Sequence, residues 1–309
     1  MLMSEKPIFA LMYDFDKTLS PKDMQTYAFI PAIGMTEGDF WAECGRVMRE
    51  NNMDQILAYM FVMFRKAKGK FLFTRDTLRA LGEKVELFDG VETWFKRVND
   101  YAEARGMRAQ HYIISSGLKE IIEGTRISQN FERIYAAEYC YDENGEPCWP
   151  AMAVNYTSKT QFLFRINKGV LDVTENDGLN EFMEEDKRPV PFRNMVYIGD
   201  GLTDVPCMKL VRTNGGRSIA VYQNNNEAVN TLLLQGRVDY VIKADYSQGG
   251  NLEKAVFAII DQAMATNITT QMHVQSMEQA QAQARETLVK ELEHSFDRMK
   301  IDNGLEGQR

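Results

Sequence analysis

Three short apolar segments, each ending in a small polar loop, constrain the fold of this chain more than any other feature. With their loops they are Ile8–Tyr13 before Asp14–Thr18, His111–Ile114 before Ser115–Gly117, and Met195–Ile198 before Gly199–Asp204. Short apolar runs bounded by turn residues are typical of buried strands. Helical segments separate them, and this alternation predicts an α/β fold: a parallel sheet with helices on both faces.

The rest of the chain divides by composition into further strands and an inserted helical region. Strands are expected at 134–137, 151–154, 218–222 and 238–242, the first two flanking a turn at 142–145. Residues 21–88 are expected to form an all-helical cap, with helices at 37–51, 54–66 and 74–86. Trp41 and the run Tyr59–Phe64 are assigned to hydrophobic packing. The predicted core then comprises residues 1–20 and 89–263.

The last region, residues 264–309, has a different pattern. Apolar residues recur there every three or four positions, as at Met277, Ala280, Ala284, Leu288 and Leu292. This spacing predicts one amphipathic C-terminal helix. Packing of that helix on its own core is the preferred interpretation, and a homodimer formed through it is the alternative.

Charge and hydropathy exclude several classes of function. The chain has 36 Lys and Arg against 44 Asp and Glu, a net charge of −8. An acidic chain argues against binding to nucleic acids or to anionic membranes. No apolar run has the length of a membrane span, and residues 1–7 carry no signal-peptide core, so a cytoplasmic location is expected. Cys140 and Cys148 flank the turn at 142–145 and are expected to be reduced thiols.

Carboxylates in the loops after the predicted strands indicate a metal site. Loops that follow parallel strands gather at the carboxyl edge of the sheet, where ligands bind. Asp14, Asp16, Asp200 and Asp204 would converge there and repel one another. A bound Mg²⁺, which prefers carboxylate oxygens and water, resolves that repulsion.

Phosphoryl transfer fits such a site. Asp14 lies directly at a strand end, where its carboxylate can attack phosphorus to form an aspartyl-phosphate. Asp16, two residues further on, can protonate the leaving oxygen and later take a proton from water. A small phosphorylated metabolite is the substrate that this chemistry implies.

The second loop and a downstream lysine complete the predicted phosphate site. Ser115 offers a hydroxyl, and Ser116 and Gly117 offer backbone N–H groups at an expected helix start. A lysine is needed to neutralise the nucleophile and the phosphoryl oxygens. Lys159, which begins a predicted helix, is preferred over Lys168 for that role.

These motifs, in this order, resemble those of the haloacid dehalogenase-like hydrolase superfamily. Asp14–Leu19 matches its first motif (Asp-x-Asp-x-Thr), Ser115 its second, Lys159 its third and Gly199–Asp204 its fourth. The cap between the first two motifs is similar to that of the phosphoserine-phosphatase-like branch. The resemblance spans about residues 8 to 245 and does not include the tail after Met264.

The resemblance implies a Rossmann-like core and a Mg²⁺-dependent phosphomonoesterase. It implies metal ligands at the side chains of Asp14 and Asp200 and at the backbone carbonyl of Asp16, with Asp204 as a ligand or its neighbour. Thr18 would orient the first loop at the phosphate. A phosphomutase or phosphotransferase on the same core, or a non-catalytic protein that binds a phosphorylated metabolite, are alternatives.

Two departures from that branch concern the substrate. Lys17 stands where its members usually have Ser, and Asp23 stands where they use Glu to contact the substrate amine. The resemblance further implies a cap arginine at the substrate, and the sequence does not rank the four candidates Arg46, Arg49, Arg65 and Arg75.

Overall fold

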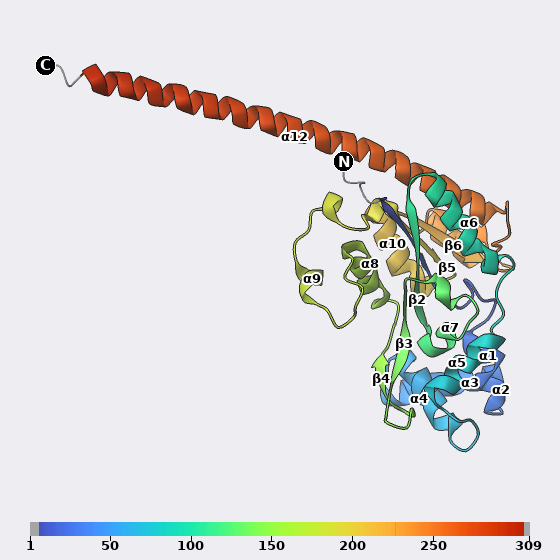
Figure 1. Ribbon diagram of the computed structural model, residues 1–309. Helices are drawn as coiled ribbons and strands as arrows, with labels where there is room; N and C mark the ends of the chain where they lie inside the picture. Colours follow the sequence, from blue (N-terminus) through green and yellow to red (C-terminus); the bar gives the residue numbers. More distant parts are fainter. Residues whose placement is uncertain (1–5, 226, 306–309) are drawn as a thin grey trace. The chain divides into compact units, whose positions relative to one another are not determined.

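The computed structural model describes residues 6–225 and 227–305, with side chains as far as residue 296. Its strands form one seven-stranded sheet in the order β4-β3-β2-β1-β5-β6-β7 (Figure 1). The strands are β1 (Ile8–Tyr13), β2 (Arg108–Leu118), β3 (Arg133–Tyr141), β4 (Pro147–Met152), β5 (Met195–Gly199), β6 (Arg217–Tyr222) and β7 (Tyr240–Lys243). The predicted α/β fold is confirmed.

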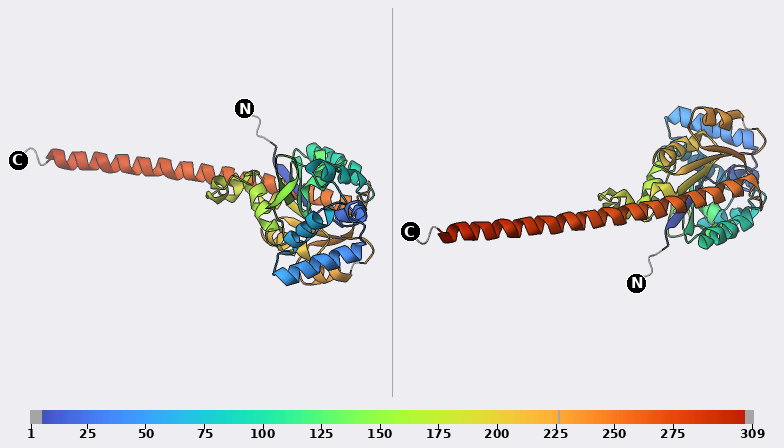
Figure 2. Two further views of the ribbon diagram at one scale, coloured as in Figure 1. Left: turned by 90° about the horizontal axis from the view of Figure 1, so that it is seen from below. Right: turned by 90° about the horizontal axis from the view of Figure 1, so that it is seen from above.

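Helices connect the strands and cover both faces of the sheet (Figures 1 and 2). They are α1 (Met24–Tyr27), α2 (Phe29–Ala32), α3 (Glu37–Asn51), α4 (Gln55–Ala67), α5 (Arg75–Leu81), α6 (Val91–Ala104), α7 (Lys119–Glu123), α8 (Lys159–Lys168), α9 (Asp177–Asn180), α10 (Val205–Thr213), α11 (Glu227–Leu234) and α12 (Asn251–Leu305). Single 3-10 turns lie at Gly82–Lys84, Ser128–Asn130, Glu185–Lys187, Phe192–Asn194 and Leu202–Asp204.

The sheet is parallel except at one edge. β1 pairs in parallel with β2 and β5, and the parallel pairing continues from β2 to β3 and from β5 through β6 to β7. β4 runs antiparallel to β3, across the turn that was expected between these two strands. The cause is the predicted turn, where the Asp142 carboxylate accepts from the N–H groups of Asn144 and Glu146. A turn this short can only join antiparallel strands.

Each face of the central strands is buried under its own set of helices. Met12 and Tyr112 belong to a cluster that also contains Phe162 of α8 and Met208 of α10. Successive residues of a strand point to opposite faces. Tyr13 accordingly lies on the other face, where it contacts Phe95 of α6. Burial on both faces explains why these strands read as continuous apolar runs.

The predicted cap region folds as α1 to α5. Thr36 caps α3 by accepting from the Asp39 N–H, and Asp54 caps α4 by accepting from the N–H groups of Ile56 and Leu57. The third predicted helix is shorter than expected, since α5 ends at Leu81 and a 3-10 turn follows. The boundaries of the cap as a domain stay a prediction.

Helix α12 contains the predicted C-terminal helix but begins earlier, at Asn251. Its first turns bury Leu252, Val256 and Ile260. The chain separates into two compact units, Met1–Ala263 and Met264–Arg309. The described part of the second unit is a single helix, with no other element of its own on which to bury Met272 or Leu288. Packing on the core and homodimer formation both stay predictions.

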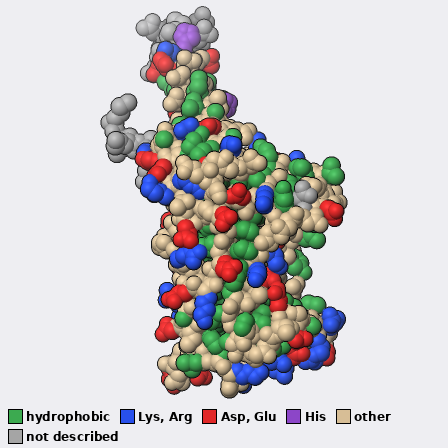
Figure 3. Space-filling view, turned by 90° about the vertical axis from the view of Figure 1, so that its right-hand side faces the viewer, with side chains coloured by type: hydrophobic (Ala, Val, Ile, Leu, Met, Phe, Trp, Pro, Cys, Tyr) green, Lys and Arg blue, Asp and Glu red, His purple; other side chains and the backbone are tan. Residues whose placement is uncertain are grey.

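Charged side chains of both signs are interspersed on the face shown in Figure 3. Apolar side chains lie between them rather than in one continuous area. Among the described residues, no helix combines the length and the hydropathy that are required to cross a bilayer.

Candidate active site

The carboxyl ends of β1, β2 and β5, with the loops that follow β1 and β5, open into one cavity of about 730 Å³. Asp14, Asp16, Ser115 and Asp200 line it, although nearly the whole chain separates the first from the last. Helices α3 and α4 supply the opposite wall. We call these strand ends and loops the floor of the cavity and the α3–α4 side its cap wall. The expected convergence at the sheet edge therefore occurs.

Asp14 is fixed at the end of β1. Its N–H donates to the Ile198 carbonyl across the sheet at 3.0 Å, and its Oδ1 accepts from the Phe15 N–H at 2.7 Å. Its Oδ2 lies 3.0 Å from the Lys159 ammonium. Burial raises the pKa of Asp14 to about 6, while the Lys159 charge opposes that rise. The carboxylate is thus buried, oriented and paired with a cation.

Lys159 joins two carboxylates beneath the floor. It is the first residue of α8 and is fully buried. Its Nζ lies 2.7 Å from Oδ1 of Asp204, which also accepts from the Tyr197 hydroxyl at 2.7 Å. Burial alone would lower the pKa of Lys159, but Asp14 and Asp204 outweigh burial and raise it. The lysine is therefore a fixed positive charge under the nucleophile position.

Three carboxylates form a candidate metal centre. One oxygen from each of Asp14, Asp200 and Asp204 lies within 4.8 Å of the other two. Oδ2 of Asp204 is buried and has no hydrogen-bond partner among the described residues. An orphaned buried oxygen is costly unless something binds it. An all-oxygen set of this kind fits a hard cation such as Mg²⁺.

Gly199 makes room for this centre. A Cβ built on Gly199 would lie 2.4 Å from Oδ2 of Asp204. Burial raises the pKa of the Asp200 carboxyl, and the charges of Asp204 and Asp14 raise it further. Such mutual repulsion is what a bound cation would relieve.

Asp16 also lines the cavity, in a different environment from Asp14. Its Oδ1 accepts from the Met24 N–H at 2.8 Å. Burial, followed by the charges of Asp23 and Asp14, raises the pKa of Asp16 well above its usual range. No cation within the described residues contacts it as Lys159 contacts Asp14. The two carboxyls can therefore favour different protonation states, as an acid and a nucleophile require.

The second predicted loop proves to be strand. β2 continues to Leu118, so Ser115, Ser116 and Gly117 are extended, and α7 begins only after them. The Gly117 N–H donates to the Ser115 hydroxyl at 3.1 Å. A Cβ on Gly117 would lie 2.1 Å from Cε of Met24, so a side chain here would displace the end of the Met24 side chain. All three residues line the cavity, as expected of a phosphate site.

Thr18, Lys17 and Asp23 differ in their relation to the cavity. Thr18 is fully buried, does not line the cavity, and its carbonyl accepts from the Tyr246 hydroxyl at 2.8 Å. Lys17 lines the cavity with a left-handed φ of 57°. Its ammonium lies 2.9 Å from Asp23. Asp23, the residue expected to meet a substrate amine, is thus paired with an ammonium of the chain itself.

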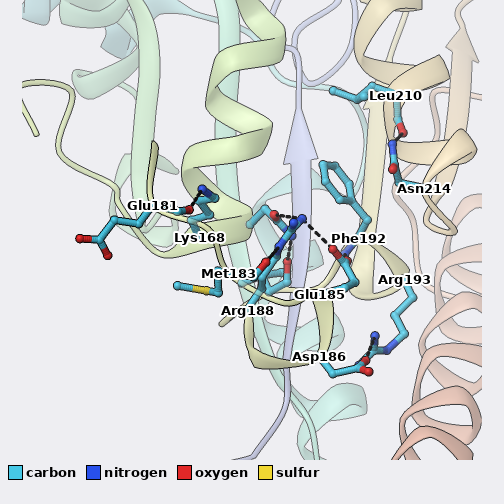
Figure 4. A network of polar contacts seen from close by, with 12 residues as sticks. Lys168, Glu181, Met183, Glu185, Asp186, Arg188, Phe192, Arg193, Leu210 and Asn214 are labelled. Atoms are coloured by element: carbon cyan, nitrogen blue, oxygen red, sulfur yellow. Dashed lines mark hydrogen bonds and ion pairs between the residues drawn. The ribbon is translucent and has the colours of Figure 1, made fainter. Parts of the chain in front are cut away.

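Lys168, the alternative to Lys159, points away from the site. In Figure 4 its ammonium lies against the segment that follows α8, where it donates to the carbonyls of Leu179 and Glu181. Arg188 secures the same segment through Asn167 and Glu185. The long stretch between α8 and β5 is therefore held by its own contacts.

The cap wall contains Trp41 and Tyr59, which sequence reasoning assigned to hydrophobic packing, and further apolar residues beside them. Trp41 and Met48 of α3, and Ile56 and Tyr59 of α4, line the cavity. Their spacing fits a core stripe equally well, so the sequence held no signal to separate the two roles. The Tyr59 hydroxyl donates to the Ser116 carbonyl at 2.8 Å and so ties the cap wall to the floor.

Comparisons with known proteins agree with this architecture. A family model described as haloacid dehalogenase-like hydrolase matches residues 11–209. An uncharacterized protein of Borreliella burgdorferi is 27% identical over an alignment of 273 residues, which covers 79% of this chain and 94% of that protein.

Two solved structures show a similar fold. A HAD family hydrolase from Salmonella enterica serovar Typhi has a TM-score of 0.50 at 15% identity. The match covers 77% of this chain and 68% of the Salmonella chain. A probable phosphoserine phosphatase from Vibrio cholerae, in unliganded form, has a TM-score of 0.53 at 13% identity. The match covers 85% of this chain and 67% of the Vibrio chain. At such identities the likeness is one of fold.

Proposed function

Because the chain belongs to the haloacid dehalogenase-like hydrolase family, we propose that it is a Mg²⁺-dependent phosphatase of a small phosphomonoester. The observation that carries this proposal is the buried Asp14–Lys159–Asp204 arrangement at the floor of the cavity. It pairs an oriented carboxylate with a fixed cation, beside a second carboxyl that favours its protonated form. The reaction would pass through an aspartyl-phosphate on Asp14.

Mg²⁺ would be held by Asp14, Asp200 and Asp204, the three residues whose oxygens converge. The resemblance adds the backbone carbonyl of Asp16. When bound, the ion would neutralise charge on the phosphoryl oxygens as the transfer proceeds. The residues of the chain then account for binding, orientation and proton transfer.

In the first half-reaction, a carboxylate oxygen of Asp14 would form a bond to phosphorus while the bond from phosphorus to the ester oxygen breaks. Asp16 would give its proton to that departing oxygen, so that a neutral alcohol leaves. The raised pKa of Asp16 supports the protonated state that this step needs. Lys159 would offset the negative charge that gathers beside Asp14.

In the second half-reaction, a water oxygen would bond to phosphorus and the bond to the Asp14 oxygen would break. Asp16, now ionised, would take a proton from that water. Inorganic phosphate leaves, and both carboxyls return to their starting states. Ser115 and the nearby backbone of β2 would hold the phosphoryl group, and the cap wall would keep bulk water out.

The test is phosphate release from a panel of phosphomonoesters, with Mg²⁺ and with a chelator. We expect release that requires Mg²⁺ and disappears in Asp14→Asn, a loss of at least about 10³-fold because the nucleophile is removed. Asp76→Asn, an exposed aspartate of α5 outside the cavity, is the matched control and should keep full activity.

An Asp14→Asn variant that retains its rate would overturn the nucleophile. Release that is indifferent to the chelator would overturn the metal requirement. Transfer to an added alcohol in preference to water would favour the phosphotransferase alternative.

A further inference from the structure

One face of α3 forms much of the cap wall. Glu37, Trp41, Cys44 and Met48 follow one another at helical spacing and all line the cavity. Ile56 and Tyr59 of α4 line it beside them, and Tyr156 and Leu202 do so from the floor side. The part of the cavity above the carboxylates therefore contains a set of aromatic and aliphatic side chains, with the polar Gln25 and Gln55 beside them.

The arginines of the cap do not line this cavity, as far as the described residues go. Arg46 pairs with Glu43 and Glu50 on the outer side of α3. Arg75 lies over the Tyr141 ring, and Arg65 lies over the Phe61 ring. Arg49 is exposed, and its side chain lies along α3. A Cβ built on Gly45 would be 3.3 Å from the Arg49 Nη1.

The charges that do line the cap side are acidic. Asp23 and Glu37 are both in the cavity lining. Among the described residues, Lys17 is the cation that lines the cavity, and its ammonium already lies 2.9 Å from the Asp23 carboxylate. A carboxylate on the substrate would lose its hydration here without gaining a free cation, next to like charges.

Two unpartnered polar groups on this side suit a neutral ligand. Gln25 lines the cavity, is 1% exposed, and its Oε1 has no hydrogen-bond partner within the described chain. The indole Nε1 of Trp41 is equally without a described partner. Buried polar groups left unpaired are costly, so a ligand that pairs with them gains affinity. A hydroxyl or amide group can do so without bringing a charge.

From these observations we infer the substrate class of this site, an inference that rests on the proposed phosphatase function. The alcohol part of the phosphomonoester is uncharged, packs an apolar or aromatic body against Trp41, Met48 and Tyr59, and hydrogen-bonds to Gln25. A cavity of about 730 Å³ has room for an alcohol of that size. Phosphoserine, with its carboxylate, is a poor fit.

The first experiment compares kcat/KM for 2-phenylethyl phosphate, phosphoethanolamine and phosphoserine. We expect 2-phenylethyl phosphate to exceed phosphoserine by at least about tenfold, since pocket contacts of this kind discriminate to that extent. Phosphoethanolamine separates the ammonium from the carboxylate and is expected to lie between them. Equal or better hydrolysis of phosphoserine would overturn the inference.

The second experiment places the missing cation in the wall. Met48→Arg should shift the ratio of the two kcat/KM values at least about tenfold toward phosphoserine. Leu72→Arg is the matched control, because Leu72 is exposed outside the cavity, and it should leave the ratio unchanged. Arg49→Ala should leave it unchanged as well. A loss of phosphoserine hydrolysis in Arg49→Ala would show that Arg49 reads an anion and would contradict the inference.

Failure of the inference and failure of the proposed function give different results. If no ester releases phosphate, the proposed function fails. The wall is then tested by calorimetric binding of the same intact esters to the Asp14→Asn protein. Tighter binding of 2-phenylethyl phosphate supports the substrate class, and tighter or equal binding of phosphoserine overturns it.

Discussion

The floor and the cap wall of the cavity face each other but use their residues differently. At the floor, Asp14, Asp16 and Asp200 follow strand ends, where the sheet fixes each backbone, and Lys159 at the start of α8 pairs with Asp14 and Asp204 from below. The cap wall places side chains on one face of α3 and α4, with Glu37 as the charged residue of those two helices in the lining. The floor is organised for chemistry, and the wall for shape.

That difference explains how such a fold separates reaction from specificity. The floor residues depend on one another, since Lys159 holds both Asp14 and Asp204. Replacing one of them disturbs the others. The apolar wall residue Met48 takes no part in these ion pairs, so that a replacement there can alter the ligand and leave the reaction in place.

The largest effect is expected from Asp16→Asn. Asparagine keeps the hydrogen bond from Met24 but can neither give nor take the proton. General acid–base catalysis contributes about 10²–10⁴-fold, so kcat should fall by that factor. Rapid-quench measurement should show that both phosphorylation and dephosphorylation are slowed.

The wall provides the control for this change. Met48→Leu, a conservative replacement on α3, should change kcat little. If Asp16→Asn and Met48→Leu alter kcat equally, the contrast between floor and wall is wrong.

The next effect concerns stability. Lys159→Met leaves the carboxylates of Asp14 and Asp204 buried without their cation. Removing one partner of a buried ion pair costs about 3–5 kcal/mol in the free energy of unfolding. Burial already raises the pKa of Asp14, and the variant removes the Lys159 charge that opposes this rise, so the folded pKa of Asp14 would lie further above its unfolded value. The stability of the variant should therefore recover as pH falls and Asp14 is protonated.

Chemical denaturation at pH 7 and at pH 5 measures this directly. Lys168→Met is the matched control, because that lysine donates to backbone carbonyls away from the cavity. Equal losses in the two variants, with no recovery at pH 5, would show that Lys159 has no special electrostatic role at the floor.

The floor was also the part that the sequence allowed us to predict. Asp14, Asp16 and Asp200 follow buried strands, and the rule that parallel strand ends share an edge places them together. Extended strand through Ser115–Gly117 was not predicted, because those residues are usual in loops. The short turn at 142–145 was predicted, and it makes β4 antiparallel to β3. The one error does not move the floor residues apart.

The cap wall could not be predicted. Trp41 and Met48 have the spacing of a packing stripe, and only the placement of α3 over the sheet exposes them to a cavity. Gln25 carries no sequence signal at all. The pairing of Lys17 with Asp23 depends on the left-handed conformation of Lys17, which lysine rarely adopts. Such features depend on tertiary structure rather than on local pattern.

A smaller effect is expected beneath the floor, at His111. Its Nε2 lies 3.0 Å from Oδ1 of Asn99, and its Nδ1 lies 3.0 Å from the Tyr13 hydroxyl. The Trp94 indole N–H donates to that same hydroxyl at 2.9 Å. One neutral tautomer satisfies this chain, with Nε2 donating and Nδ1 accepting. Burial lowers the pKa of His111 to about 3.

Because the folded pKa of His111 lies below the unfolded value near 6.5, the unfolded chain binds the extra proton between these two limits. This residue should therefore remove stability as pH falls below about 6.5, by up to about 1.4 kcal/mol per pH unit. Between pH 7 and pH 5, the free energy of unfolding should fall less with decreasing pH in His111→Gln than in the parent protein. His273→Gln, at an exposed position of α12, is the control. An unchanged slope in His111→Gln would contradict the neutral buried histidine.

The smallest effect concerns Lys17, which links the floor to the cap through Asp23. A left-handed conformation costs a residue with a Cβ about 1–2 kcal/mol, and glycine avoids that cost. A half-exposed ion pair of this kind contributes about 0–1 kcal/mol. Lys17→Ala loses the pair and keeps the strain, whereas Lys17→Gly loses the pair and releases it. Lys17→Gly should thus be the more stable variant, by about 1 kcal/mol after the greater unfolded-state entropy of glycine is counted.

Thermal unfolding of Lys17→Ala and Lys17→Gly, compared with Asp23→Asn, which removes only the ion pair, measures the two contributions separately. If Lys17→Ala is as stable as Lys17→Gly, the left-handed turn is not strained, and the ion pair alone explains why a lysine occupies this position between floor and wall.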